Sequence, residues 1–330
     1  MNNFQKIPFD DIVNFGQQTM LTQKLFSVSW ILARFCNYNC SYCWPYARTS
    51  TPDHYALEVY LRALDRIKSQ AKKNGFDKFH FSFSGGEPTA YKYFNKIIDH
   101  YSNDDVSEYQ SLHMTTNLSP GLKWWERWLG NTESLQRRSI TASFHHEFAN
   151  EKEFIKKCLY LIENQVFITI NQVMVPDNFD QLYKRCKQFS DNGINVTLKP
   201  QSDPTASFIV DGYTEDQIIK MQTGFPQVWN GVELPQVELM DSKGNKYYID
   251  QAERFNAFGF NKFKGWTCNA GYQSLVIREN QVKRSYSCHD ELIGEIDQDF
   301  EIFKQPKICI TPSCVSSADS KIPKRKTDES

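Results

Sequence analysis

From residue 26 to about residue 201, apolar β-branched stretches alternate with amphipathic stretches, and this alternation constrains the fold most strongly. Alternating strands and helices predict βαβ units, whose strands lie parallel in one sheet. Six strands are too few for a closed barrel of eight, so we expect an α/β fold with an open, partial (β/α)6 barrel. Ligands of such sheets gather at the carboxyl ends of the strands. Strands are expected at 25–34, 78–84, 111–115, 139–144, 166–175 and 196–199, and helices at 55–74, 91–101, 121–128, 151–164 and 179–192.

The remaining segments follow other patterns. Residues 1–25 are expected to be an N-terminal extension and 26–204 the barrel, followed at 205–264 by a connecting segment on the substrate side. That segment has a helix pattern at 214–222 and strand-like pieces at 232–239 and 246–250. A small cysteine-bearing module is expected at 265–317 and a polar tail at 318–330. The basic residues of the tail, Lys321, Lys324, Arg325 and Lys326, predict a solvated end.

Charge and hydropathy patterning argue against two kinds of partner. The net charge of −1 gives no overall field to attract nucleic acid or an anionic membrane, so we expect neither as a partner. No run of about 18 apolar residues occurs, and no secretory signal opens the chain. We therefore expect a cytoplasmic protein, whose nine cysteines bind metals or do chemistry rather than form disulfides.

Three cysteines, Cys36, Cys40 and Cys43, follow the first expected strand on one short loop. Such a loop can aim three thiolates at one place, and thiolates of this kind hold iron–sulfur clusters. Three protein ligands on a four-iron cluster leave one iron open. A zinc site would need a fourth ligand close by, and the nearest histidine, His54, lies beyond an expected loop.

The pattern Cys-x3-Cys-x2-Cys, with Tyr42 before the last cysteine, resembles the signature of the radical S-adenosylmethionine (SAM) superfamily. The resemblance implies that Cys36, Cys40 and Cys43 hold a 4Fe–4S cluster whose open iron chelates SAM, and that Tyr42 lies against the adenine. It also implies reductive cleavage of SAM to a 5′-deoxyadenosyl radical, which abstracts hydrogen from a substrate. A reductant such as flavodoxin or ferredoxin would supply the electron.

Residues at later strand ends extend this resemblance. Gly85-Gly86-Glu87-Pro88 resembles the family motif that contacts the SAM amino group, since glycine permits close backbone approach and a carboxylate accepts from an ammonium. Asn117 fits the family's Thr-Asn-Gly only in part, because Leu118 replaces the glycine. By the same resemblance, Ser143 bonds the SAM ribose or carboxylate. Gln172 is a further candidate, although alternation sends only half of its strand's side chains inward.

Other titratable residues near these strand ends have two interpretations each. His145 is a candidate acid–base group, because histidine titrates near neutrality, and a supporting or surface role fits it equally. His146 and Glu147 are expected to be supporting or surface residues. Cys158 and Cys186 lie in expected helices, where cysteine usually serves as a small buried hydrophobe.

A second set of cysteines comprises Cys268, Cys288, Cys309 and Cys314. Apolar runs around the polar turn 278–281 predict a β-hairpin with a cysteine at each outer end, and a short helix is expected before Cys309. Four thiolates fit either an iron–sulfur cluster or zinc. The Cys-x-Ala-Gly opening, the hairpin and the late cysteine pair resemble the twitch domain, a shortened SPASM domain, which implies an auxiliary 4Fe–4S cluster.

Two substrate classes follow from these resemblances. One hypothesis is an enzyme that forms a cross-link, thioether or epimerised residue in a ribosomally made peptide. The other is a dehydrogenase or epimerase of a small molecule, such as a sugar or aminocyclitol. We favour the peptide class, although the 25 or so residues before the first strand are too few for a peptide-leader-binding domain. A non-catalytic iron–sulfur or zinc scaffold would leave the Gly85-Gly86-Glu87-Pro88 motif unexplained.

Overall fold

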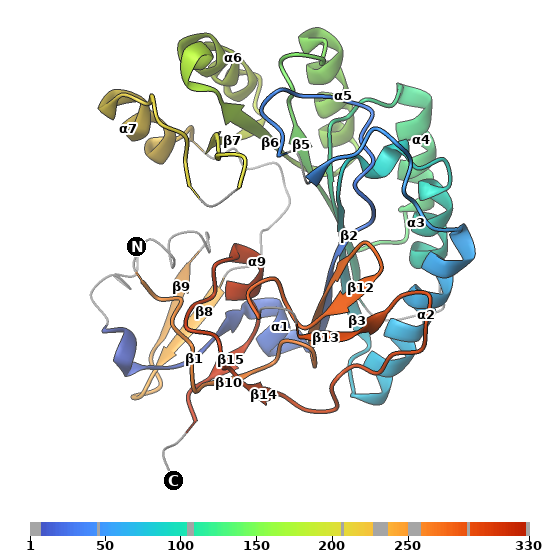
Figure 1. Ribbon diagram of the computed structural model, residues 1–330, viewed down its shortest axis with the longest axis vertical. Coiled ribbons are helices and arrows are strands. Elements are labelled where there is room, and N and C mark those ends of the chain that lie inside the picture. Colours follow the sequence, from blue (N-terminus) through green and yellow to red (C-terminus); the bar gives the residue numbers. More distant parts are fainter. Residues whose placement is uncertain are drawn as a thin grey trace.

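The larger sheet of the computed structural model is an open parallel barrel (Figure 1). The structure describes residues 8–44, 47–103, 109–205, 208–226, 237–249, 259–288 and 291–327. Six strands follow one another in chain order, each parallel to the next. They are β2 (Leu25–Ile31), β3 (Lys78–Ser84), β4 (Gln110–Thr116), β5 (Arg137–Ser143), β6 (Phe167–Met174) and β7 (Asn195–Pro200). The predicted partial barrel is therefore confirmed.

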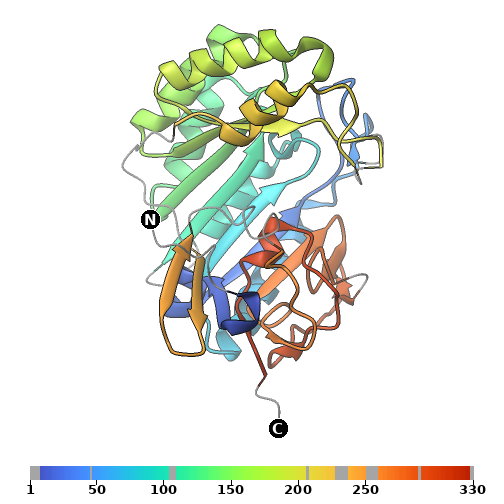
Figure 2. The same cartoon turned by 90° about the vertical axis from the view of Figure 1, so that its left-hand side faces the viewer.

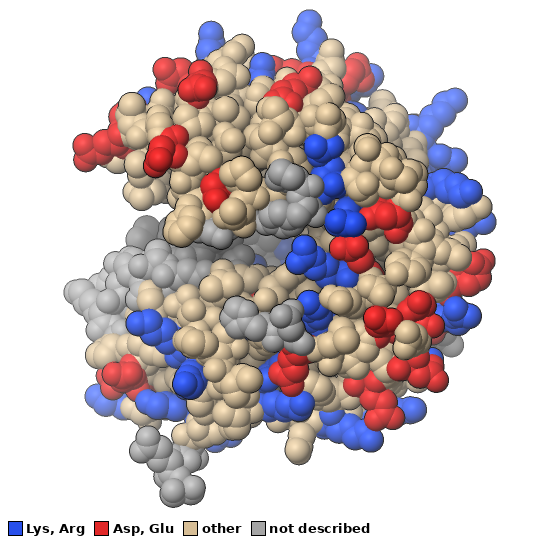
Figure 3. All heavy atoms as spheres, viewed as in Figure 1, with Lys and Arg blue, Asp and Glu red and all other residues tan. Residues whose placement is uncertain are grey.

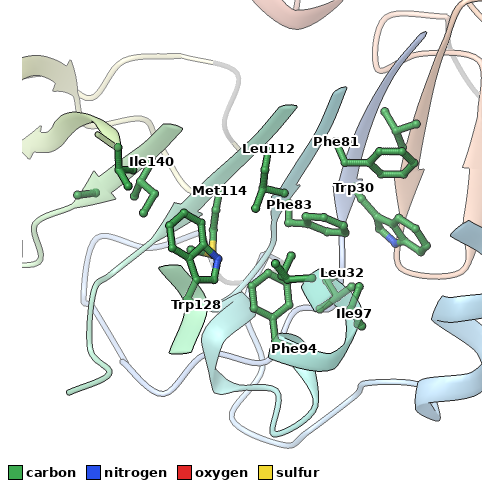
Figure 4. Packing of buried hydrophobic residues seen from close by; sticks show 14 of the residues in the cluster. Trp30, Leu32, Phe81, Phe83, Phe94, Ile97, Leu112, Met114, Trp128 and Ile140 are labelled. Atoms are coloured by element: carbon green, nitrogen blue, oxygen red, sulfur yellow. The ribbon is translucent and has the colours of Figure 1, made fainter. Parts of the chain in front are cut away.

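Helices cover the convex face of this sheet (Figure 1). They are α2 (Leu57–Lys73), α3 (Phe94–Asn103), α4 (Leu122–Asn131), α5 (Glu151–Glu163) and α6 (Phe179–Asp191), all near their predicted places. In α2 the apolar residues Tyr60, Leu64 and Ile67 recur at helical spacing and are buried against the strands. Figure 4 shows Phe81, Phe83, Leu112, Met114 and Ile140 on the strands packing toward Phe94, Ile97 and Trp128 on the helices. This layer holds the barrel together.

The C-terminal hairpin belongs to the barrel sheet. The predicted hairpin is confirmed, with β11 (Ser274–Arg278) antiparallel to β12 (Gln281–Lys283). However, β11 also pairs parallel with β2, from Ser274 opposite Ser27 to Arg278 opposite Ile31, and β13 (Leu292–Glu295) extends the sheet. The hairpin thus covers the edge that β2 would otherwise present, and exposed edges invite pairing. The short helix predicted before Cys309 is wrong, since residues 291–308 form strands, a turn and loops.

A smaller antiparallel sheet brings the two ends of the described chain together (Figure 2). Its strands, in order, are β14 (Lys307–Ile308), β10 (Thr267–Cys268), β15 (Lys324–Arg325), β1 (Ile12–Gln17), β8 (Val237–Asp241) and β9 (Lys246–Ile249). Phe15 on β1 lies opposite Lys324 on β15. The prediction of a solvated end is wrong here, because Lys324 is only 2% exposed. Apolar groups of β1, β8 and the 260–268 segment form a second core, which residues 318–327 help to cover.

Three further α-helices are short: α1 (Gln18–Gln23), α7 (Glu215–Thr223) and α9 (Ser317–Ser320). The predicted helix at 214–222 is confirmed by α7, which begins with a capping box between Thr214 and Gln217. Of the strand-like piece at 232–239, residues 232–236 lie outside the described residues. No described helix is long and apolar enough to cross a membrane. On the face in Figure 3, acidic and basic side chains are interspersed.

Candidate active site

The loop with the first three cysteines begins where β2 ends, and backbone hydrogen bonds fix its start. The Asp53 carboxylate accepts from the amides of Arg34 (3.0 Å) and Phe35 (2.9 Å). The Cys36 amide donates to the Thr49 carbonyl (3.1 Å). The loop is therefore anchored to the residues that follow it before any ligand binds.

Gly85 and Gly86 let the end of β3 touch this loop. The Gly86 amide donates to the Ala33 carbonyl (2.9 Å), and the Glu87 amide donates to the Phe35 carbonyl (2.8 Å). A Cβ on Gly86 would overlap the carbonyl oxygens of Arg34 and Phe35, and Gly85 has a φ of +141°. Only glycine allows this approach, so the motif shapes the cysteine loop as well as the strand end.

The Glu87 carboxylate ties the ends of β3 and β4 together. It is 2% exposed and accepts from the Thr116 hydroxyl (2.7 Å) and the Asn117 amide (2.6 Å). Burial raises the pKa of this carboxyl, and the hydrogen bonds oppose that rise. The Asn117 side chain in turn donates to Asn37 on the cysteine loop (2.9 Å). Leu118 takes the left-handed conformation (φ +53°), which glycine adopts more readily than leucine.

His145 lies against the cysteine loop, where its ring packs near that of Tyr42. Its Nδ1 is 3.3 Å from the Cys40 Sγ and 3.0 Å from the Tyr42 hydroxyl. Burial lowers the pKa of His145 to about 4, so its imidazole is neutral at pH 7. Tyr42 also stacks on His146, at 5.3 Å between ring centroids. Glu147, expected to be a supporting or surface residue, accepts from the Ser41 amide (2.9 Å) and so holds the cysteine loop directly.

The three thiols are protonated when no metal is bound. Burial raises the pKa of Cys40 to about 12 and also raises those of Cys36 and Cys43. Arg48 beside Cys43 opposes the rise there. Metal binding at this loop must therefore displace protons. In the described part of the chain no three Cys, His, Asp or Glu side chains converge on a single ion. Thiolates of a four-iron cluster bind separate irons, so the three thiols of the loop need not converge on one ion to hold it.

Strand alternation separates the remaining candidates. On β5 and β6, Ile140, Ala142, Ile168 and Ile170 pack in the helix-facing core, so Ser143 and Asn171 face the concave side, paired in adjacent strands. Gln172 has the parity of Ile170 and is fully buried, with its Nε2 bonded to the Val173 carbonyl (2.7 Å). The prediction that Gln172 reaches SAM is therefore wrong in orientation, and Asn171 takes the inward position.

The concave side of the sheet is lined by polar side chains that the sequence reasoning missed. His80 Nδ1 lies 2.8 Å from the Ser111 hydroxyl, and His113 Nδ1 lies 2.9 Å from the Ser139 hydroxyl. Burial lowers the pKa of His80 to about 3 and that of His113 to about 4. The sequence pattern could have identified them, because both histidines alternate along their strands with the buried Phe79, Phe81, Leu112 and Met114.

Three residues of the second set of cysteines, Cys268, Cys309 and Cys314, are buried in the second core. Cys268 lies on β10, and the Cys309 amide donates to the Trp266 carbonyl (2.7 Å). Burial raises the thiol pKa values of Cys288, Cys309 and Cys314, and in each case the charge of Cys268 adds to the rise. Cys268 is thus within electrostatic range of each of the other three thiols. A pocket of about 610 Å³ opens beside Cys288 and is also lined by Arg284, Glu291 and Lys307.

Asp53 and Arg48 also went unpredicted. Asp53 holds the start of the cysteine loop, and Arg48 faces Cys43. No motif marks Asp53, whereas Arg48 is the first basic residue after the cysteines and was visible as such.

Fold and site together define a class, an open parallel barrel with a three-thiol loop at its strand ends. The model of the Radical SAM superfamily matches residues 30–218, and the chain belongs to this superfamily. Membership implies a 4Fe–4S cluster and SAM as cofactors.

Individual relatives are distant. The radical SAM cyclopropyl synthase TigE of Paramaledivibacter caminithermalis is 22% identical over 224 residues, 60% of this chain and 46% of the relative. The chain thus spans less than half the length of that relative. Native anSMEcpe with bound AdoMet has the same fold, with a TM-score of 0.51 and 15% identity over 84% of this chain and 79% of that one. BtrN in complex with AdoMet and 2-DOIA matches at a TM-score of 0.35 and 12% identity, over 61% of this chain and 82% of that one.

Proposed function

We propose that this chain uses SAM to modify a ribosomally made peptide, by a cross-link, a thioether or the epimerisation of a residue. The observation that carries its radical chemistry is the cysteine loop seated on the Gly85-Gly86-Glu87 strand end. A reduced 4Fe–4S cluster with bound SAM supplies a 5′-deoxyadenosyl radical that abstracts hydrogen from a C–H bond.

In this proposal the chain's own residues hold and shield the reactants. Cys36, Cys40 and Cys43 would hold the cluster, while Tyr42, Gly85, Gly86, Glu87, Asn117 and Ser143 line the strand ends where SAM is expected. His145 is neutral at pH 7 and contacts Cys40, which favours a positioning role for it over an acid–base role. Fixing the substrate carbon beside the radical carbon makes the transfer effectively unimolecular.

We also propose that Cys268, Cys288, Cys309 and Cys314 hold an auxiliary 4Fe–4S cluster, in preference to zinc. Cys268, Cys309 and Cys314 are buried in the second core, and the charge of Cys268 reaches Cys288 as well, which supports a tetrathiolate site. A flavodoxin- or ferredoxin-like protein would supply electrons to the enzyme.

The exposed apolar side chains of the 208–226 segment support a peptide substrate. Phe208 is 76% exposed, Ile209 57% and Ile219 53%. They lie near β7, which is an edge of the large sheet among the described strands. Exposed apolar side chains beside a strand that pairs on one side only among the described strands suit an extended chain, which binds by adding a strand.

A small polar substrate is the second candidate, and the concave face favours it. The partly exposed His80 and His113 lie there, held by the hydroxyls of Ser111 and Ser139, and polar groups of this kind suit a sugar or aminocyclitol. The reaction would then be a dehydrogenation or an epimerisation.

Deuterium transfer separates the two candidates. The anaerobically loaded chain would be given SAM, dithionite and either a deuterated candidate peptide from a neighbouring small reading frame or deuterated sugars and aminocyclitols. We expect deuterium in 5′-deoxyadenosine from the peptide. Transfer from a sugar or aminocyclitol alone would reject the peptide proposal.

A second set of assays defines the outcome and the background. Peptide products would be examined for cross-links, thioethers, inverted residues and, given the relative named above, cyclopropane rings. Joint replacement of Cys36, Cys40 and Cys43 by alanine should abolish SAM cleavage, and persistent cleavage would reject the assigned cluster site.

A further inference from the structure

Lys324 is a buried cation that the proposed chemistry leaves unexplained. It is 2% exposed, and its Nζ donates to the carbonyls of Asp319 (2.7 Å) and Ile322 (2.9 Å). The same Nζ lies 4.7 Å from the centroid of the Phe263 ring. Burial of an ammonium costs several kcal/mol unless an anion compensates it, and carbonyl oxygens are neutral.

The second set of cysteines lies beside Lys324 and would be anionic once its thiolates hold a cluster. Lys324 on β15 lies directly opposite Cys268 on β10. Its charge also acts on Cys309 and Cys314, where it opposes the rise in thiol pKa that burial causes. Lys324 is therefore within electrostatic range of three of the four thiols.

A second buried cation, Arg284, stands by the fourth thiol. It is 2% exposed, and its guanidinium bonds to the Ala270 carbonyl (3.2 Å) and to Glu291 (2.9 Å). Its charge acts on Cys288. Glu291 is shared with Lys307 (3.1 Å), so this carboxylate does not belong to Arg284 alone.

The local charge is positive even after the nearby carboxylates are counted. Asp319 is buried near Lys324, and the charge of Lys324 opposes the rise in its pKa that burial causes, so this carboxylate offsets part of the lysine's charge. The cations Arg284, Lys307 and Lys324 outnumber the carboxylates Asp319 and Glu291. Iron–sulfur potentials depend on net charge, hydrogen bonds to sulfur and solvent exposure, and a nearby cation favours the reduced, more negative form.

We propose that Lys324 is a positioning residue that acts as a buried counter-charge to the auxiliary cluster and raises its reduction potential. This inference rests on the auxiliary cluster proposed above. One electron enters the cluster without bond making or breaking, from a one-electron donor such as dithionite in vitro. The ammonium stabilises the added charge.

The test is a redox titration of the full chain with Cys36, Cys40 and Cys43 replaced by alanine, so that only the second site is loaded. Dithionite would be the titrant and the EPR signal of the reduced cluster the readout. In this background K324Q should titrate at a more negative potential than its parent. K324R, which keeps the charge, should stay near the parent. R325Q, which removes an exposed charge from the same strand, is the matched control and should not shift the potential.

The outcomes separate the inference from the proposal beneath it. If the background binds zinc or no iron, the auxiliary cluster itself is rejected. The other outcomes apply when the background binds a 4Fe–4S cluster. The role of Lys324 is overturned if the cluster of K324Q has the same reduction potential as that of its parent. It is also overturned if K324R shifts the potential as much as K324Q does. K324M, which keeps an unbranched apolar side chain of similar length, is the second neutral variant. Loss of iron from both neutral variants but not from K324R would support the counter-charge, whereas loss from K324R as well would overturn it.

Discussion

Gly86 is the residue on which the geometry of the first site depends most directly. In Gly86→Ala, the new Cβ would overlap the carbonyl oxygens of Arg34 and Phe35, so the cysteine loop must move. We expect at least a tenfold loss of SAM cleavage and of iron at the first site, measured as 5′-deoxyadenosine formed and iron bound. Gly130→Ala is the control, because nothing lies within 4 Å of a Cβ there and alanine favours its helix. Equal activity of the two variants would contradict the role of Gly86 in shaping the cysteine loop.

The buried histidines should make stability depend on pH. The folded pKa of His113 is about 4, below the unfolded value of about 6.5, so acid protonates the unfolded chain first. Stability is therefore lost as the pH falls from about 6.5 toward 4. Between pH 7 and 5 the unfolding free energy of wild type should fall by up to about 2 kcal/mol more than that of His113→Gln. Urea unfolding at both pH values measures this, and an equal fall in the two proteins would refute it.

Gln172 and Asn171 show what sequence patterns resolve at the scale of single residues. The strand and its end were predicted correctly, yet the wrong one of two adjacent polar residues was chosen. The buried Ile168, Ile170 and Met174 show which side chains of β6 face the helices. Gln172 falls on the same face as these residues, so the alternation selects Asn171 for the concave face. By contrast, Asp53 and Glu147 accept hydrogen bonds from backbone amides that are 19 and 106 residues away in the sequence, and no local pattern encodes such partners.

Among the elements, β11 decides whether the C-terminal hairpin is a separate module. Ile277 is fully buried in the barrel core, whereas Leu292 on β13 is 50% exposed. Ile277→Ala should lower the global unfolding free energy by about 2–5 kcal/mol, and Leu292→Ala should change it by about 0.5 kcal/mol or less. Urea denaturation followed by tryptophan fluorescence measures both. A separate early transition in Ile277→Ala, with the main transition unmoved, would show that the hairpin unfolds independently.

The parallel pairing of β11 with β2 was not predicted, and the reason is physical. Periodicity reports which residues of a strand are buried, but the choice of partner depends on which edge remains open in the assembled sheet. The helices and strands that alternate locally were found near their true bounds. Contacts between distant segments, such as Cys268 with Lys324, were not.

At the scale of the whole molecule, the two separate cores predict that the second cysteine site can be lost while the first cysteine site is retained. Removal of residues 321–330 deletes β15 and bares Phe15 and Phe263, whereas the barrel core remains intact. We expect iron per chain to fall from about eight to about four, with SAM still bound. Iron analysis and SAM-binding calorimetry measure this, with R325Q as the control that should keep both clusters. Loss of all iron on truncation would contradict the independence of the two sites.

The pairing of β1 with β15 also fixes an order of events during synthesis. Phe15 leaves the ribosome early, but its partner Lys324 is translated only after the barrel strands and the hairpin. The barrel can therefore collapse while translation continues, since domains generally form as the chain emerges. The small sheet must wait for its last strand, so iron delivery to the second site comes late, and an interrupted chain would carry at most the first cluster.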